Sequence, residues 1–407
     1  MDTLIAIEEA VYRLQKAVDV CSFEEIAVED AYGRVLAVDV CALLDVPHYD
    51  RAMLDGFAVQ AIDIAKTTRE HPVELEIIET VGAGKMPSTE LTSGTAVRTM
   101  TGAPIAKGAD AIVRLEYADE IVKAGTRIVR VYRAVGVQEA IQQRGHDIRR
   151  GDILLQAGTV LSAVEIAVLA ANGFGVIQVT RRPRVAIVAT GSEVVPLGQP
   201  LQPGQLYNSN TPMLRSLVLQ TGGTAASFLP VGDDPQQLKT RFEEALDSCD
   251  VLVTTGGVSV GDYDLTPVVL ENLGVKRLFW GVWMRPGTPI YAGVYEDRIV
   301  LALSGNPAAA YVNALLLLVP LLRKMSGQKF REIQMKARLK NPPHKRRVKH
   351  TRFFAGDLVL FDNEVWIDVS GEHSSGVMTN FIAKTALARV ESDDELVDGT
   401  LVNVILL

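Results

Sequence analysis

Three glycine-containing turns, each with polar residues beside it, are the part of this sequence best suited to chemistry. They are Thr190-Gly191-Ser192-Glu193, the segment 255–264 (TGGVSVGDYD) and Ser304-Gly305-Asn306-Pro307. Glycine lets a backbone approach a ligand closely and present its N–H groups to an anion. Glu193 and Asp264 add carboxylates, and Mg2+ is usually held by one or two carboxylates together with phosphate oxygens. The turns therefore predict a site for a phosphorylated ligand and a divalent cation.

The elements around these turns belong to a parallel-sheet pattern. Apolar strands are predicted at 184–190, 250–257 and 298–305, and they alternate with helical patterns at 211–223, 235–248 and 308–318. The carboxyl ends of parallel strands share one edge of the sheet, which is where ligands bind in such folds. A single glycine after a strand is usually only a turn, and an acidic residue there often caps a helix. Three such turns on one edge favour a binding site.

The rest of the chain is mostly β-type. Residues 4–19 predict an amphipathic helix that can pack back on the α/β region, and 163–172 predict another helix. Strands are predicted at 73–81, 111–117, 127–133, 334–340, 357–361, 364–369 and 400–407. The basic run 344–352 (HKRRVKHTR) is interpreted as a solvated strand edge or the rim of an anion pocket.

Composition narrows the class of protein. A chain of 407 residues predicts two to four domains, and its net charge of −8 disfavours nonspecific nucleic-acid binding. The richest apolar run, 314–322, contains Pro320 and predicts a buried helix instead of a membrane span. The N-terminus lacks the basic region of a signal peptide. The three cysteines stand far apart and are expected to be reduced, buried and structural, as in a cytoplasmic protein: Cys21, Cys41 and Cys249.

Two further motifs are weaker. Gly82-Ala83-Gly84-Lys85 looks like part of a P-loop, but the first glycine is missing and Met86 replaces the required serine or threonine. Residues 257–261 match the G-x-S-x-G turn of α/β-hydrolases, with histidines downstream. That turn needs a helix directly after Ser259, whereas Val260-Gly261-Asp262 follows here, so hydrolysis is a minor alternative.

Several segments in the same order resemble the MoeA family of molybdopterin molybdenumtransferases, whose animal counterpart is the E domain of gephyrin. The most specific is 81–116, with Met100-Thr101-Gly102-Ala103-Pro104 at its centre. The other matching segments are 47–59, 144–148, 189–194, 254–264, 284–289 and 303–310. The similarity extends over nearly the whole chain.

The resemblance implies a multidomain α/β plus β protein that forms an elongated homodimer. Its parallel-sheet domain would have the fold of the molybdopterin adenylyltransferase, the expected upstream partner. The expected domains are an α/β domain (1–20 plus 182–327), a connecting β domain (21–45 plus 149–181), a β-rich domain (46–148) and a C-terminal β barrel (328–407). No membrane is expected to be involved.

The resemblance also implies a reaction. Adenylylated molybdopterin and molybdate, with Mg2+ or a similar divalent cation, would give molybdenum cofactor and AMP. The catalytic residues would be Asp55, Thr101 and Glu193, and the metal-binding ones Asp55, Glu193 and Asp264. The expected substrate-binding residues are Asp147, Gly191, Ser192, Asp233, Asp234, Gly256, Gly257, Ser259, Asp264, Arg285, Pro307 and Ser375, with one of the two adjacent aspartates functional. The cleft would form across the dimer, with Asp55 and Thr101 facing the α/β domain of the other subunit.

Some positions depart from the family pattern. The common S-A-M-D-G-Y reads 52–57 AMLDGF here, and M-K-P-G-K-P reads 284–289 MRPGTP. Gly281 stands where many members have lysine, and Ser304 replaces a proline. Two alternatives therefore stay open: a pterin- or nucleotide-binding scaffold without turnover, and a paralogue that prefers tungstate. Without the neighbouring lysines, Arg285 is expected to be the main cationic contact for the anionic substrate.

Overall fold

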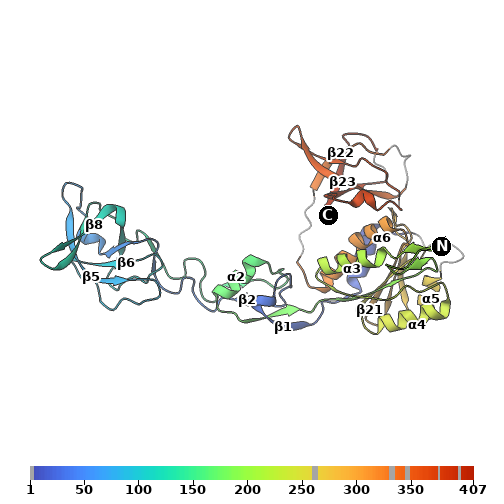
Figure 1. The fold of residues 1–407 in the computed structure, drawn as a ribbon, viewed down its shortest axis with the longest axis horizontal. Coiled ribbons are helices and arrows are strands. Elements are labelled where there is room, and N and C mark those ends of the chain that lie inside the picture. Colours follow the sequence, from blue (N-terminus) through green and yellow to red (C-terminus); the bar gives the residue numbers. More distant parts are fainter. Residues whose placement is uncertain (1–3, 259–264, 330–334, 344–348, 375, 393–395) are drawn as a thin grey trace.

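The computed structural model describes residues 4–258, 265–329, 335–343, 349–374, 376–392 and 396–407. Figure 1 shows an extended chain, with the sheet of β5, β6 and β8 at one end and the α/β sheet at the other. The smaller β elements around α2 lie between them, and the C-terminal strands lie beside the α/β sheet. The predicted fold class, α/β plus β with a C-terminal barrel, is confirmed.

The α/β sheet has six strands in a mixed arrangement. Their order is β16 (Thr224–Ser227), β13 (Arg184–Ala189), β17 (Val251–Thr255), β21 (Arg298–Leu303), β20 (Tyr291–Tyr295) and β18 (Lys276–Trp280). The first four are parallel, as the sequence predicts. The last two are antiparallel, an addition that the sequence pattern does not show.

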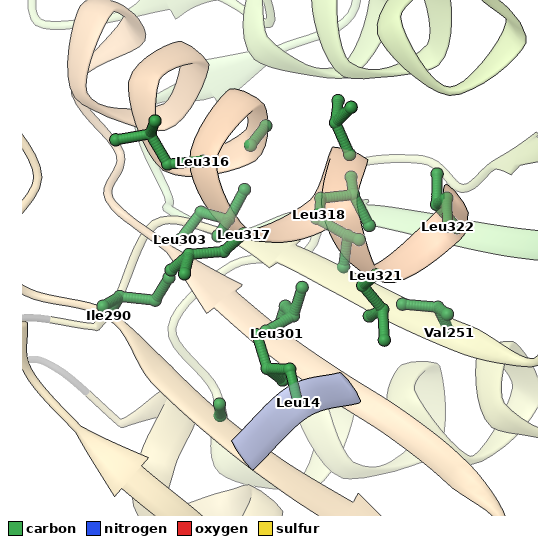
Figure 2. Packing of buried hydrophobic residues seen from close by; sticks show 14 of the residues in the cluster. Leu14, Val251, Ile290, Leu301, Leu303, Leu316, Leu317, Leu318, Leu321 and Leu322 are labelled. Atoms are coloured by element: carbon green, nitrogen blue, oxygen red, sulfur yellow. The ribbon is translucent and has the colours of Figure 1, made fainter. Parts of the chain in front are cut away.

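Helices cover both faces of this sheet. Helices α1 (Ile7–Lys16), α3 (Asn210–Gln220), α6 (Pro307–Asn313) and α7 (Val319–Met325) share one hydrophobic core with it, while α4 (Pro235–Leu246) and α5 (Thr266–Asn272) share the other. In α1, Ile7, Ala10 and Leu14 are buried at helical spacing. Figure 2 shows Leu14 close to Leu301 of β21, with leucines of 316–322 gathered nearby.

The helix after β21 is longer than predicted. It runs without interruption from Pro307 to Met325, and its middle, Ala314–Leu318, is a π-helical turn. Pro320 has no N–H to donate, and its ring crowds the carbonyl of Leu316. The wider turn, in which the Val319 N–H donates to Ala314, accommodates the proline. Length and composition alone would let this helix cross a membrane, yet 72% of its apolar window is buried inside the protein.

The distal sheet is formed by residues within 46–148. Its strand order is β7 (Ala111–Arg114), β4 (Gly56–Val59), β6 (Thr95–Thr99), β5 (Val73–Val81), β9 (Thr126–Val131) and β8 (Ala118–Lys123). β5 and β6 are parallel, and the other neighbours are antiparallel. The predicted strand 111–117 ends early because Leu115–Tyr117 forms a 3-10 turn.

Short strand pairs connect the two ends. They are β1 (Phe23–Ala27) with β12 (Val176–Thr180), β2 (Val40–Cys41) with β11 (Ile153–Leu155), and β3 (Arg51–Ala52) with β10 (Ile141–Gln142). A further short pair, β14 (Val194–Val195) with β15 (Leu206–Tyr207), lies in the α/β region between β13 and α3. Helix α2 (Ala163–Ala171) begins with a capping box between Ser162 and Glu165. The prediction of three buried cysteines is wrong for Cys41, which is exposed on the two-residue strand β2; Cys21 is half-buried and only Cys249 is buried.

The C-terminal strands close into a five-stranded barrel. Its strands are β23 (Thr351–Phe361), β24 (Glu364–Asp368), β22 (Met335–Lys340), β26 (Leu401–Leu406) and β25 (Ala386–Val390), which pairs back with β23. The short strand β19 (Met284–Arg285) joins β23 from the α/β region. This pairing brings the barrel against the turn that contains Arg285.

Candidate active site

A cavity of about 1000 Å³ lies at the carboxyl ends of the central parallel strands. β13, β17 and β21 are neighbours in register, so the turns that follow them open on the same edge. Gly191, Gly256, Gly257 and Gly305 all line the cavity. The glycine turns singled out in the sequence therefore meet at one surface.

Two of these glycines are required by close approach. A Cβ on Gly256, which has φ +106°, would lie 2.3 Å from the carbonyl oxygen of Thr190. Gly191 has φ +132°, and a Cβ there would lie 2.6 Å from the Glu193 carboxylate. A side chain at Gly256 would push its turn away from Thr190, and a side chain at Gly191 would displace the Glu193 carboxylate. The missing side chains thus let two backbone turns pack against each other beneath the cavity.

The acidic wall of the cavity carries Glu193 and Asp233. Asp233 is held by Ser192, whose N–H and hydroxyl donate to the Asp233 carboxylate at 3.1 and 2.5 Å. Asp234 has a different contact: its carboxylate caps helix α4 by accepting the Gln237 N–H at 2.8 Å. Of the two adjacent aspartates, Asp233 is therefore the one whose side chain belongs to the cavity wall.

The basic residues of the cavity lining come partly from the barrel. Arg285 and Pro286 line the cavity together with Arg352, Phe354 and His373 of the C-terminal strands and loops. Arg352 is only 4% exposed. Parallel pairing of β19 with β23 places Arg285 opposite Arg352. Arg352, the last residue of the basic run 344–352, therefore lines the same cavity as Arg285. The prediction that Arg285 is the main cationic contact remains to be tested.

The positive charge of Arg285 affects the pKa of His350. Burial lowers the pKa of His350, and the positive charge of Arg285 lowers it further. His350 also lies against the ring of Trp283, with centroids 4.8 Å apart. A neutral imidazole adds no positive charge beside Arg285, so the arginines supply the positive charge of this part of the cavity.

Two buried polar atoms on the cavity wall lack partners within the described chain. They are the Thr190 hydroxyl and the Asn210 side-chain oxygen. The amide nitrogen of Asn210 donates to the Thr255 hydroxyl at 2.8 Å and to the Gly305 carbonyl at 2.9 Å, which fixes the side chain. Leaving a buried polar atom unpaired costs about 1–3 kcal/mol. A bound ligand or water would satisfy these atoms.

Asp55 and Thr101 form a pair at the other end of the molecule. The Thr101 N–H and hydroxyl both donate to one carboxylate oxygen of Asp55 at 2.7 Å. Both bonds lower the pKa of the Asp55 carboxyl, and the bond from the Thr101 backbone N–H has the larger effect. The pair is exposed and belongs to the distal sheet, and Asp147 is also exposed within 46–148. None of the three lines the cavity of the described chain.

The remaining predicted residues divide into two groups. Pro307 lines the cavity, at the start of α6. Ser259, Asp264 and Ser375 lie outside the described residues. Sequence reasoning missed Asn210, Phe354 and His373, although Asn210 stands in a polar stretch directly before a helical pattern. The other two became cavity residues only through the long-range pairing of β19 with β23.

Comparisons with known proteins match most of the chain. Residues 5–173 match the model “MoeA N-terminal region (domain I and II)”, and residues 186–324 match the model “Probable molybdopterin binding domain”. The chain is 38% identical to the molybdopterin molybdenumtransferase of Bacillus subtilis (strain 168), over 79% of this chain and 75% of that protein. It is 36% identical to that of Nostoc sp. (strain PCC 7120), over 88% and 82%. A crystal structure of molybdopterin biosynthesis MoeA protein from Pyrococcus horikoshii OT3 superposes with a TM-score of 0.84 at 28% identity, covering both chains fully.

Proposed function

Since the chain belongs to the family of molybdopterin molybdenumtransferases, we propose that it inserts molybdenum from molybdate into adenylylated molybdopterin and releases AMP. The observation that carries this proposal is the cavity of about 1000 Å³, with glycine backbone on one side and Arg285 and Arg352 on another. Backbone amides and guanidinium groups suit the oxygens of phosphate and molybdate. The pterin dithiolene is the soft ligand that receives the metal, so no protein cysteine is needed.

The carboxylates provide for a divalent cation such as Mg2+. No three described acidic, histidine or cysteine side chains come together as a metal-binding group. Mg2+ typically uses one or two carboxylates and takes its other oxygens from phosphate and water. Glu193 in the cavity and Asp55 in the distal sheet would supply these carboxylates, with Asp264 as the alternative to one of them. A bound cation would neutralise charge that develops on the phosphate oxygens.

The protein's own groups bind and orient the substrates. Arg285 and Arg352 would hold an oxyanion, and Asn210 would accept a hydrogen bond from the ligand through its unpaired oxygen. Glu193 would steer protons as molybdate oxygens leave as water. Gly281, at the position where many relatives have lysine, is buried with φ +92°, and its missing Cβ leaves room for Leu4. Gly281 packs against the N-terminal segment and does not line the cavity of the described chain, so the absence of a lysine there does not change the charge of the cavity wall.

A complete site would need two subunits. Asp55 and Thr101 belong to the distal sheet, which lies far along the chain from the cavity (Figure 1). We therefore propose a homodimer in which the Asp55–Thr101 pair of one subunit faces the cavity of the other. We place the enzyme in the cytoplasm, downstream of a molybdopterin adenylyltransferase.

Complementation tests the shared site. Asp55→Asn and Glu193→Gln proteins should each be inactive, while dimers re-formed from a mixture should regain about one quarter of the parent activity. Half of the dimers would then be mixed, and each mixed dimer would hold one intact site. No recovery after verified subunit exchange would contradict the shared site.

The reaction itself is tested by AMP release. Purified protein is given adenylylated molybdopterin and Mg2+ with molybdate, with tungstate or with neither. Release that depends on an oxyanion supports the transferase, and the faster oxyanion identifies the metal preference. Binding without release in every case would favour the non-catalytic scaffold.

A further inference from the structure

The loop after β5 presents a lysine on a tight glycine turn. In Gly82-Ala83-Gly84-Lys85, the Lys85 N–H donates to the Gly82 carbonyl at 3.2 Å, and Gly84 has φ +79°. This φ is that of the third residue of a type II β-turn, where glycine is favoured. Lys85 therefore stays within about 7 Å of Gly82, measured between Cα atoms.

Strand register places this turn beside Thr101. β5 and β6 are parallel with Val81 opposite Thr99, and the Met100 N–H donates to the Val81 carbonyl at 3.1 Å. Gly82 follows Val81 and is opposite Met100, and Thr101 is the next residue after Met100. Gly82 and Thr101 therefore leave the same end of this strand pair.

Asp55 lies at this same end. β4 is antiparallel to β6, with Gly56 opposite Thr99, so the residue before Gly56 meets the residues after Thr99. The hydrogen bonds from Thr101 to the Asp55 carboxylate confirm that contact. Strands β4 and β5 flank β6, so Asp55 and the turn that carries Lys85 lie on the two sides of Thr101 at this end of the sheet.

The lysine is accessible and its loop is held in place. Lys85 is exposed and forms no ion pair within the described chain, whereas Lys107 pairs with Glu90 at 2.9 Å. Downstream, the Glu79 carboxylate accepts the Ser88 N–H and hydroxyl and the Thr89 N–H at 2.9–3.1 Å. Nothing lies within 4 Å of where a Cβ would stand on Gly82 or Gly84. The loop is thus anchored at both ends and open to a ligand.

We propose that Lys85 binds the phosphate groups of the adenylylated substrate, next to Asp55 and Thr101; this inference rests on the proposed function. A divalent cation near Asp55 would be shared with phosphate oxygens, so phosphate is the anion expected at this end of the sheet. The oxyanion has its own cations across the site, Arg285 and Arg352. The ammonium of Lys85 would provide a positive charge on the distal sheet that contacts the substrate phosphates.

Equilibrium binding of adenylylated molybdopterin without oxyanion tests the proposal in the full-length protein. The variants are Lys85→Ala, Lys85→Arg and the matched control Lys66→Ala. Lys66 is exposed and unpaired within the described chain, and it follows the other end of β4, beyond Ala61–Ile64. Each alanine variant removes one charge from the same domain. We expect Kd to rise about 10-fold for Lys85→Ala, with arginine recovering most of it and the control unchanged.

Further readouts separate binding from folding and turnover. Added salt should weaken binding by the parent more than by Lys85→Ala, because an exposed charge contact is screened. The molybdate affinity of Lys85→Ala should be unchanged, because Lys85 is assigned to the phosphate groups and not to the oxyanion. Equal Kd values for parent and Lys85→Ala, equal losses in both alanine variants, or a loss confined to molybdate would each overturn the proposal. A parent that binds substrate without releasing AMP would refute the enzyme function, yet the Kd comparison would still decide the role of Lys85. A parent that does not bind would overturn both.

Discussion

Replacing Asp250 by asparagine should destabilise the α/β domain and leave substrate binding unchanged. Asp250 comes directly before β17, whereas the cavity lies after the other end of this strand, at Thr255 and Gly256. The Asp250 carboxylate holds Arg181 through two bonds of 2.9 and 3.2 Å. It also accepts the Arg184 N–H at 2.7 Å and a guanidinium nitrogen of Arg184 at 3.1 Å. These bonds fasten the connecting segment to the sheet.

The size of the effect follows from the pKa of this carboxyl. Burial would raise it, but the bonds from Arg181 and Arg184 outweigh burial and lower the pKa from 3.8 to about 2. At about 1.4 kcal/mol for each pKa unit, this is worth roughly 2.5 kcal/mol at neutral pH. Because the folded pKa is depressed, the contribution is complete above pH 3.8 and is lost as the pH falls towards 2. For a domain of 150–250 residues, it corresponds to about 5–10 °C in Tm.

Thermal unfolding at pH 7 measures the change, with Asp247→Asn as the matched control. Asp247 is exposed near the end of α4 and forms no ion pair within the described chain. We expect a lower Tm for Asp250→Asn, an unchanged Tm for Asp247→Asn and an unchanged KM for both. The difference between parent and Asp250→Asn should shrink in acid between pH 3.8 and 2. A parent-like Tm with impaired binding would refute the separation between a stabilising end and a ligand-binding end of β17.

Three further changes act on the cavity itself. Glu193→Gln keeps the shape of the side chain and removes its charge, so AMP release should fall about 10²-fold or more while circular dichroism stays the same. Gly256→Ala should lower both Tm and activity, since its Cβ would lie 2.3 Å from the Thr190 carbonyl; Gly175→Ala, where nothing lies within 4 Å, is the control. Arg285→Ala should raise the Kd for molybdate about 10-fold or more by titration calorimetry, with Arg285→Lys recovering part of the loss. If Arg285→Ala binds molybdate as tightly as the parent, Arg352 is the main cationic contact instead.

Local patterns in the sequence predicted the elements that hold the glycine turns. The apolar runs of β13, β17 and β21 and the helices between them agree with the structure to within a few residues, because each is determined by its own periodicity. The strand β25 was missed, since its pairing with β23 depends on closure of the barrel. The π-helical turn before Pro320 was also missed. The sequence shows that a proline interrupts the helical hydrogen bonds, but not that the backbone widens by one residue to accommodate it.

The site was predictable where it depended on strand ends and not where it depended on contacts between distant segments. Asp233 and Asp234 are adjacent and chemically identical, and only the backbone at the start of α4 shows that Asp234 is the cap. Arg352 and His373 reach the cavity because β19 pairs with β23, which no local pattern reveals. The role of Arg285 as the main cationic contact stays a prediction, with Arg352 as a second cation on the same cavity.

The central claim is that molybdenum enters the dithiolene as AMP leaves. The most direct test gives the protein adenylylated molybdopterin, Mg2+ and molybdate, and measures both the AMP released and the molybdenum retained by the pterin. The account predicts about one molybdenum for each AMP, with neither formed by Glu193→Gln. AMP released at full rate without molybdenum in the pterin would mean that the cavity only hydrolyses the nucleotide, and this would contradict the account.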